Sequence, residues 1–569
     1  RGFDFTAGRI DSMSDELESK SASRDHNLIE HIERRLSAPG GQPPSVVVRS
    51  SPQTFGDFAV FFGKDAGAGM LTKLMGELGS DPEISFSKRS GNKLTLRVAD
   101  QTIVEMGRRL ETGSPSGLRT ADLLHGKRYF VDYGDPNATK ALHVGHLRCV
   151  ALGHGVASVL KSAGAEVTTL SLVNDIGRNM CEAMAGYVEM FPDDTPESTG
   201  MKSDHFVGRC YSAYVNSLKS PDAYEGTLDA PLGRELEERV DLAQSLLQRW
   251  SAGDPEVREL WSKVRRWVLS GQDATVKRLG ALQDRMLHES LALERAAKMV
   301  DEGLQKGIFR QTSTGVVYDT GLQEYQHMPL VRPDGFPTEN MRLAAVFYDL
   351  QEEGRGLEAC VHIMGDEWVQ LIACRERMLP RFIECPLYAV YHKLGCAMVT
   401  FHGSKMKSSS GEVLLIDELI DRVAAMDEVQ KLSSGSGPTP EDLARILILS
   451  FYLAKKPSKT IEFSWENFIS PSQNAGWDLA AAWSRASLKG TWSGASDPDP
   501  EDASYRYAIL RSQCLRQSVM QSALSYDVLP AMNYLSHLAA WYLGAEPKTR
   551  LDRVMHTVFC EGLASLGLI

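Results

Sequence analysis

The segment DPNATKALHVGHLR (135–148) constrains the fold more than any other, because it joins an apolar run to a helical pattern. The run RYFVDYG (128–134) predicts a buried strand, and HLRCVALGHGVASVLKSAG (146–164) predicts a helix that ends at Gly164. The next run, AEVTTLSLVND (165–175), predicts a second strand. Strand, helix and strand in this order form a βαβ unit, which requires a parallel sheet with a right-handed crossover.

Two histidines flank a glycine in this segment, at the place where open parallel sheets bind ligands. His143, Gly145 and His146 would lie at the carboxyl end of the first strand, where the N-terminus of the next helix presents free N–H groups. Glycine lets a nucleotide approach the backbone, and two imidazoles could donate to phosphate oxygens. An HxGH segment is also an ordinary helix start, and these four residues alone favour that interpretation.

The 569 residues are too many for one hydrophobic core, and their patterns divide the chain into four parts. Residues 1–26 predict a polar tail, and 27–122 predict a small α+β domain with a helix and a hairpin. Residues 123–432 predict the α/β domain, with a helical insertion at about 181–310. Residues 433–569 predict an all-α region.

Further patterns refine this division. We expect three later runs to complete the α/β domain as strands: GVVYDT (315–320), LEACVHIMG (357–365) and LYAVYHKLGCAMVTF (387–401). Near the C-terminus, one apolar helical stripe is formed by Met532, Leu535, Leu538 and Tyr542.

Composition excludes several classes of protein. No apolar run reaches the ~20 residues that cross a bilayer, and no secretory signal is visible. The nine cysteines contain no CxxC pair, which argues against a zinc site and against a disulfide framework. We therefore expect a cytoplasmic protein with no membrane partner and no protein-bound metal. The net charge of −12 neither predicts nor excludes a nucleic-acid surface, because net charge does not describe how charge is distributed.

A second segment, SKMKSSSGE (404–412), follows the last of these strands. It combines two lysines, three serines and a glycine. Ammonium groups on a loop suit the negative charge that develops on a transferring phosphate. Taken alone, such a loop is more often a solvated turn.

Together and in this order, the two segments resemble the HIGH and KMSKS signatures of class I aminoacyl-tRNA synthetases, most closely the arginyl-tRNA synthetase family. The resemblance extends over roughly residues 27–569, and further similar segments are SLVNDIG (171–177), AGDPEVRELW (252–261), LVRPDGFPT (330–338), KMKSSSGEVLLIDELID (405–421), the N-terminal FGDFAV and the C-terminal CEGLASLGLI. It implies a Rossmann-like catalytic domain, an anticodon-binding-like C-terminal domain, and the use of ATP with Mg²⁺ carried by the nucleotide.

The resemblance also implies roles for particular residues. The catalytic groups would be His143, His146, Lys405 and Lys407, which would hold phosphates and neutralise the departing pyrophosphate. The other ATP-binding residues would be Gly145, Gly365, Asp366, Glu367 and Ser408. The amino-acid-binding positions would be Asp132, Asn137, Asn174, Asp175, Glu339, Leu343 and Trp368.

The amino-acid positions depart from the family pattern. Glu339 and Leu343 stand where the family has Tyr and Asp, and Trp368 stands where it has Gln. A guanidinium prefers planar carboxylate partners, and Leu343 removes one. In the lysine segment, Ser409 stands where the family has its second basic residue. At the entrance to the C-terminal domain, the segment NAGWDLAAAWSRA (474–486) lacks polar groups that the family has there.

Three functions follow as hypotheses. The first is an arginine–tRNA ligase that activates arginine, or an analogue, and transfers it to tRNA. The second is a paralogue that activates another amino acid or uses a non-tRNA acceptor. The third is a catalytically silent tRNA-binding protein, against which His143, His146, Lys405 and Lys407 argue.

Overall fold

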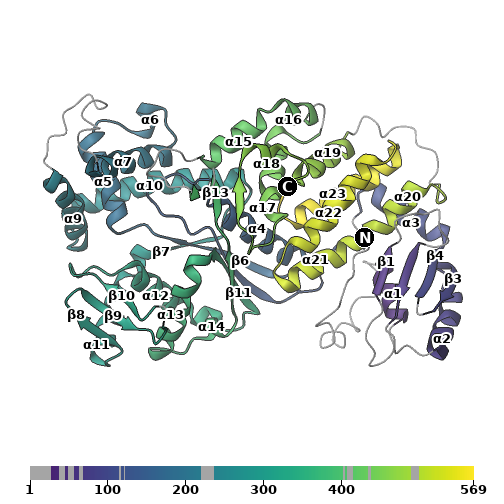
Figure 1. Ribbon diagram of the computed structural model, residues 1–569, viewed down its shortest axis with the longest axis horizontal. Coiled ribbons are helices and arrows are strands. Elements are labelled where there is room, and N and C mark those ends of the chain that lie inside the picture. Colours follow the sequence, from purple (N-terminus) through teal and green to yellow (C-terminus); the bar gives the residue numbers. More distant parts are fainter. Residues whose placement is uncertain are drawn as a thin grey trace.

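The computed structural model describes residues 27–36, 45–48, 57–62, 68–91, 93–114, 117–120, 122–219, 236–323, 325–401, 404–405, 414–433, 437–488 and 499–569. A parallel sheet lies at the centre of an elongated molecule, with a helical lobe at one end and a small N-terminal sheet at the other (Figure 1). The C-terminal helices lie between the central sheet and the N-terminal sheet. Among the helices that the structure describes, none combines the length and the apolar character that a membrane span requires.

The central sheet has five parallel strands in the order β12-β11-β5-β6-β7. Their bounds are β5 Arg128–Asp132, β6 Glu166–Val173, β7 Arg285–His288, β11 Ala359–Gly365 and β12 Tyr391–Cys396. Helix α4 (Leu147–Ser162) connects β5 to β6, so the predicted βαβ unit and parallel sheet are confirmed. The strand order reverses between β5 and β11, and such a switch point opens a crevice at the carboxyl ends of the strands.

Three details differ from the sequence-based expectation. The edge strand β7 lies within the stretch 181–310 that was expected to be a helical insertion, between the helix that ends at Arg278 and the one that begins at Leu293. The GVVYDT run is β9 (Gly315–Asp319), which pairs with β8 (Phe309–Thr312) and β10 (His327–Val331) in a separate antiparallel sheet rather than in the central one. The run 387–401 contains two strands, because β13 (Val399–Phe401) leaves the central sheet and pairs with β14 (Ser404–Lys405) and β15 (Ile461–Phe463).

Helices fill the lobe between β6 and β7: α5 Arg178–Met190, α6 Pro196–Thr199, α7 Ser203–Lys219, α9 Leu236–Ser251 and α10 Pro255–Arg278. The second lobe, between β7 and β12, contains η1 Glu289–Ala292, α11 Leu293–Gln305, β8 Phe309–Thr312, β9 Gly315–Asp319, β10 His327–Val331, α12 Glu339–Leu350, η2 Glu352–Gly354, η3 Asp366–Trp368, α13 Val369–Met378, η4 Leu379–Arg381 and α14 Pro386–Ala389. Each lobe has its own buried apolar cluster.

The N-terminal region has a four-stranded antiparallel sheet in the order β1-β2-β4-β3. Its elements are α1 Leu28–Leu36, β1 Ser45–Val48, β2 Phe58–Phe61, α2 Ala68–Gly79, β3 Ile84–Ser90, β4 Lys93–Val98 and α3 Asp100–Glu111. The predicted helix and hairpin are therefore confirmed. Alternating Leu94, Leu96 and Val98 point into the core of this sheet, as the period of a half-buried strand requires.

After β13, the chain is mainly helical. Its elements are β14 Ser404–Lys405, α15 Ile416–Ala424, α16 Asp427–Leu432, α17 Pro440–Leu453, β15 Ile461–Phe463, α18 Trp465–Ile469, α19 Gly476–Ala486, α20 Ala503–Ser512, α21 Cys514–Ser525, α22 Leu529–Gly544 and α23 Thr549–Ser565. The predicted stripe Met532, Leu535, Leu538 and Tyr542 on α22 is buried. This packing confirms its assignment as a core face.

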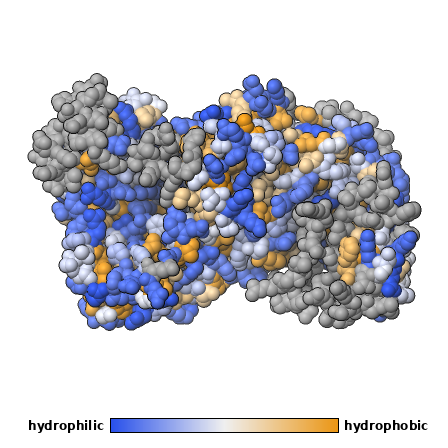
Figure 2. All heavy atoms as spheres, in the orientation of Figure 1, coloured by the Kyte–Doolittle hydropathy of each residue, from blue (hydrophilic) through white to orange (hydrophobic). Residues whose placement is uncertain are grey.

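A buried ion pair joins the N-terminal sheet to the C-terminal helices. Arg506 on α20 is 2% exposed and donates through Nε and Nη2 to the carboxylate of Asp57, at 2.8 and 2.6 Å. Nη1 of Arg506 also donates to Asp100 at 2.8 Å. The described surface on the face shown in Figure 2 is mostly hydrophilic, with hydrophobic residues scattered over it.

Candidate active site

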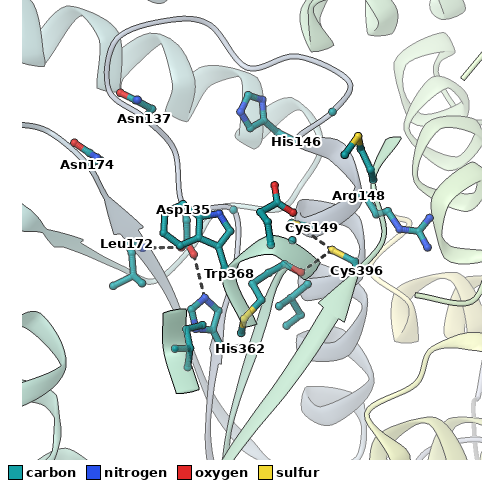
Figure 3. Close-up of a pocket in the computed structure, with 18 of the residues that line it drawn as sticks. Asp135, Asn137, His146, Arg148, Cys149, Leu172, Asn174, His362, Trp368 and Cys396 are labelled. Carbon is teal, nitrogen blue, oxygen red and sulfur yellow. Dashed lines mark hydrogen bonds and ion pairs between the residues drawn. The ribbon is translucent and has the colours of Figure 1, made fainter. Parts of the chain in front are cut away.

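A pocket of about 420 Å³ opens at the carboxyl ends of β5, β11 and β12, beside the switch point of the sheet. Figure 3 shows Asn137 and Asn174 at one side, His146 above and His362 below. The residues that line it include ten of the predicted site residues: Asn137, His143, Gly145, His146, Asn174, Glu339, Leu343, Gly365, Glu367 and Trp368. Segments far apart in sequence thus meet where the sequence predicted a site.

His143 and His146 occupy the tight turn that precedes α4. Their ring centroids are 3.9 Å apart. The backbone N–H of Gly145 donates to Nδ1 of His143, and the N–H of His143 donates to Nδ1 of His146, both at 3.1 Å. Because each Nδ1 accepts a hydrogen bond, the neutral rings carry their proton on Nε2. The turn therefore provides two N–H donors next to the pocket.

Burial keeps both imidazoles uncharged. Burial, together with the positive charge of Lys140, lowers the pKa of His146 to about 4. Burial also lowers the pKa of His143 to about 2, with added repulsion from His146 and Lys140. At neutral pH the pair therefore offers donors without net charge.

The lysine segment lies next to this turn at one described end. The N–H of Val144 donates to the carbonyl of Leu414 at 3.1 Å, and the N–H of Ile416 donates to the carbonyl of Leu142 at 3.0 Å. The backbone of Lys405 pairs with Thr400 in β14. The predicted residues Lys407 and Ser408 lie outside the described residues.

The strand end at Gly365 leads directly into η3. A Cβ placed on Gly365 would lie 2.5 Å from Oε2 of Glu367, so the missing side chain gives the Glu367 carboxylate its room. Both residues line the pocket. Asp366 is exposed and does not line it, and its contact with the nucleotide stays a prediction.

Two aspartates and a histidine form a cluster at the pocket. Nε2 of His362 lies 3.1 Å from Oδ2 of Asp135 and its Nδ1 lies 3.6 Å from Oδ2 of Asp132. Oδ1 of Asp135 accepts from the N–H of Leu172 at 2.9 Å (Figure 3). Asp132 is 2% exposed behind His362 and does not line the pocket, and its contact with the substrate stays a prediction.

Asp135 and His362 line the pocket but were not predicted as site residues. Both were detectable, because each lies at the end of a predicted strand whose carboxyl end faces the site. Burial raises the pKa of Asp132 to about 7, with His362 opposing this change. The pKa of His362 is raised as well: its burial acts against this, but the carboxylates of Asp132 and Asp135 outweigh it.

Asp175 is another of the predicted amino-acid-binding positions. Its side chain is fully buried and does not line the pocket. Arg265 donates to it at 2.7 Å, and the N–H and the hydroxyl of Ser290 donate at 2.9 and 2.8 Å. Asp175 therefore joins α10 and η1 to the end of β6, and its contact with the amino acid stays a prediction.

Helix α12 provides one wall of the pocket. Glu339 and Leu343, one turn apart, line it, and Arg342 between them points to Glu289 with an Nε–Oε2 distance of 2.6 Å. Helix α13 provides the facing wall with Ile372 and Arg375, also one turn apart. No pattern in the sequence distinguished Arg375 from the other arginines of this polar helix.

Two cysteines lie at the floor of the pocket. Sγ of Cys149 on α4 is 3.1 Å from Sγ of Cys396, which donates to the carbonyl of Met364 at 3.1 Å (Figure 3). All nine cysteines are free. Nη2 of Arg148 donates to the carbonyls of Lys456 and Pro457, at 2.6 and 2.9 Å, and ties the start of α4 to the chain before β15.

Comparison with known proteins agrees with this geometry. The family "tRNA synthetases class I (R), catalytic domain" matches residues 116–433, more than half of the chain. The fold and the pocket thus define a class I tRNA synthetase. The chain belongs to the arginyl-tRNA synthetase family.

Two curated relatives, both arginine–tRNA ligases, show how far the likeness extends. The protein of Amoebophilus asiaticus is 32% identical over 354 residues, which cover 58% of this chain and 57% of that protein. The protein of Bacteroides fragilis is 30% identical over 402 residues, which cover 67% of this chain and 66% of that protein. The chain thus matches less than two-thirds of the length of each relative.

Two solved structures share the fold. Thermus thermophilus arginyl-tRNA synthetase matches with a TM-score of 0.65 and 20% identity, covering 95% of this chain and 98% of that one. The arginyl-tRNA synthetase of Plasmodium falciparum matches with a TM-score of 0.59 and 13% identity, covering 96% and 98%. The likeness therefore extends to the N-terminal and C-terminal regions as well as the central sheet.

Proposed function

We propose that this chain is an ATP-dependent ligase that forms an aminoacyl adenylate and transfers the aminoacyl group to tRNA, as an arginine–tRNA ligase does. The observation that carries the proposal is the pair of neutral imidazoles at the switch point. Their Nε2–H groups are donors fixed by backbone hydrogen bonds, and such fixed donors stabilise charge developing on phosphate oxygens.

In the proposed reaction, a carboxylate oxygen of the amino acid attacks the α-phosphorus of ATP. A new C–O–P link forms, the bond between the α-phosphorus and the bridging oxygen breaks, and pyrophosphate leaves with that electron pair. The terminal ribose hydroxyl of tRNA then displaces AMP from the acyl carbon. Positioning and charge stabilisation supply most of the rate, with little covalent work for the protein.

The residues divide this work between them. His143 and His146 donate to phosphate oxygens, and Gly145 and Gly365 let the nucleotide lie against the backbone. Lys405, Lys407 and Ser408 neutralise and bind the departing pyrophosphate, and Mg²⁺ enters with ATP as part of the substrate. Asn137 and Asn174 contact the backbone of the amino acid. A cytoplasmic location stays a prediction from the sequence.

A second candidate is a paralogue that activates an amino acid other than arginine. The pocket wall favours it, because Leu343 is 6% exposed and offers no hydrogen bond, and Trp368 adds a flat apolar surface. Glu289 is already paired with Arg342, so Glu339 is the free carboxylate on this wall among the described residues.

Amino-acid-dependent exchange of pyrophosphate into ATP, with and without tRNA and across all common amino acids, tests the proposal. We expect at least one amino acid to support exchange. His146→Ala should lower its rate by about 10²-fold or more, because the loss of one fixed donor typically does so.

Two controls accompany this variant. His146→Gln keeps an N–H donor and should recover part of the rate, and His392→Ala removes an exposed imidazole outside the pocket and should leave the rate unchanged. Exchange by His146→Ala at the wild-type rate would overturn the assignment. Absence of exchange with every amino acid would favour a silent tRNA-binding protein.

A further inference from the structure

Helix α10 contacts the segment that carries the two pocket histidines. Gln272 on this helix is 2% exposed, and its Nε2 donates to the carbonyls of Asn137 and Lys140, at 3.0 and 2.8 Å. Asn137 and Lys140 line the pocket, and the chain continues from them into the histidine turn, residues 143–146 (Figure 3). Gln272 does not line the pocket, so it holds this segment from outside the site.

The amide of Gln272 forms hydrogen bonds at one end only. Its Oε1 is buried and has no hydrogen-bond partner among the residues that the structure describes. An unpaired buried acceptor costs stability, and an apolar side chain of similar length would avoid that cost. What the amide contributes at this position is therefore its two donations to the backbone that leads into the histidine turn.

The same helix also holds Asp417, which lies in the first turn of α15 and is 7% exposed. Oγ1 of Thr275 donates to Oδ2 of Asp417 at 2.6 Å, and Nη1 of Arg278 donates to Oδ1 at 3.0 Å. Lys202, just before α7, donates to Oδ2 at 2.8 Å. Burial opposes the charge of this carboxylate, but the donors around it outweigh burial and lower the pKa of Asp417 below its usual range. A charged carboxylate thus fixes the start of α15 against α10.

The chain just before Asp417 pairs with the histidine turn. The N–H of Val144 donates to the carbonyl of Leu414 at 3.1 Å, and the N–H of Ile416 donates to the carbonyl of Leu142 at 3.0 Å. Because Asp417 follows Ile416 directly, a shift of this carboxylate would move the backbone that pairs with the turn. Helix α10 therefore holds the histidine segment twice, directly through Gln272 and indirectly through Asp417.

We propose that Gln272 and Asp417 are positioning residues for adenylate formation, because together they fix the place of the histidine turn and the direction of its two Nε2–H donors. The inference rests on the proposed function, since it takes these donors to stabilise charge on the phosphates of ATP. Fixed donors are effective only where that charge develops, and a displacement of about 1 Å caused by a change outside the site can cost ~10²-fold in rate.

Amino-acid-dependent exchange of pyrophosphate into ATP, with tRNA present, tests this role. We expect Gln272→Met and Asp417→Asn each to lower kcat by about 10- to 100-fold. Methionine has no donor for the two carbonyls, and an amide has one acceptor oxygen where the carboxylate has two. The KM for ATP should change less than kcat, because the donors act on charge that develops in the transition state.

A double variant separates positioning from a general loss of structure. If Gln272 acts through the histidine turn, Gln272→Met should lower the rate much less in the His146→Ala background than in the wild-type chain, because coupled residues are not additive. Asp421→Asn is the matched control. Asp421 lies one turn after Asp417 and accepts from Arg278 at 2.6 Å, but its side chain is 69% exposed. This variant should keep the wild-type rate.

Amide hydrogen exchange of peptides that contain residues 142–146 gives a readout that requires no activity. Exchange should be faster in Gln272→Met and in Asp417→Asn than in the wild-type chain, and Asp421→Asn should match the wild type. If Asp417→Asn fails to fold, Gln272→Met provides both comparisons.

Three results would overturn the assignment: a wild-type kcat in Gln272→Met, full additivity of Gln272→Met with His146→Ala, or unchanged amide exchange at the turn. Any of them in a chain that catalyses pyrophosphate exchange would keep the ligase and remove the role of Gln272 and Asp417. Faster amide exchange at the turn in a chain that supports no pyrophosphate exchange would do the reverse.

Discussion

Asp132 and His362 are register partners on the neighbouring strands β5 and β11, at the carboxyl ends where the pocket begins. Both are 2% exposed. The pKa of the Asp132 carboxyl is raised because burial makes its charged form costly. The pKa of the His362 imidazole is raised because nearby carboxylates outweigh the effect of its burial. The native state therefore binds more protons than the unfolded state around neutral pH.

This proton uptake makes stability depend on pH. The pKa of Asp132 rises from about 4 in the unfolded chain to about 7, and that of His362 rises above its usual value near 6.5. Their stabilising contribution is thus complete below about pH 4 and is lost as the pH rises through 7. We expect Asp132→Asn to gain stability relative to wild type between pH 5 and pH 8, by up to about 1.4 kcal/mol per unit of pH.

Urea unfolding of both proteins at pH 5, 6, 7 and 8 measures this difference. Asp366→Asn is the control, because Asp366 is exposed and its stability difference should not change with pH. A difference between Asp132→Asn and wild type that stays constant from pH 5 to 8 would contradict the prediction.

At the level of single residues, the sequence predicted positions that share a strand end or a turn. His143, His146 and Gly365 were predictable because each follows a recognisable run in a recognisable order. The burial of Asp132 and Asp175 outside the pocket lining was not predictable, because a sequence does not show whether a carboxylate at a strand end faces the pocket or a neighbouring group.

At the level of elements, the buried central strands were predicted correctly, whereas the short edge strand β7 was not. Strands β5, β6 and β11 are apolar and largely buried, whereas β7 is four residues long, RMLH, and each residue is half-buried. Such a segment has neither a continuous apolar run nor a clear alternation, so it lacks the signal by which strands are recognised. It joins the sheet because β6 offers it an edge.

The contact between β4 and α20 shows how elements of the two chain ends hold each other. Arg506→Met would leave the 6%-exposed carboxylate of Asp57 without its guanidinium, although the N–H of Val98 still donates to it at 2.7 Å. We expect this change to lower the free energy of unfolding by about 3–5 kcal/mol, because one half of a buried pair remains charged. Chemical denaturation measures it.

Arg97→Met tests the same interface at its exposed rim. Arg97 pairs with Glu501 at 2.6 Å, but the side chain of Glu501 is 66% exposed, so this loss should stay below about 1 kcal/mol. The double variant Asp57→Asn, Arg506→Met should lose less than Arg506→Met alone. Equal effects of Arg97→Met and Arg506→Met would show that burial does not govern this contact.

At the level of the whole molecule, the acidic net charge must coexist with the proposed binding of tRNA. Residues 433–569, proposed as the anticodon-binding-like domain, would then carry a local surface that contacts phosphates. Each such contact releases counterions, so we expect the affinity for total tRNA to fall linearly on a logarithmic plot as salt rises from 50 to 200 mM. Fluorescence anisotropy of labelled tRNA measures the slope.

A DNA duplex of similar charge is the control, since a purely electrostatic surface would bind both polymers with the same slope and affinity. Preferential binding of tRNA would support the proposed acceptor. No binding of tRNA even at low salt would contradict it and would favour a paralogue with another acceptor.

The ion pair between Asp57 and Arg506 also determines when the chain can finish folding during its synthesis. The two residues are 449 positions apart. At a translation rate of ~5–20 residues per second, the ribosome adds Arg506 roughly 20–90 s after Asp57. During that interval the N-terminal sheet exists without the helices that cover it, and its inward carboxylate has no cation. The nascent N-terminal region therefore lacks this partner until α20, near the end of the chain, has been synthesised.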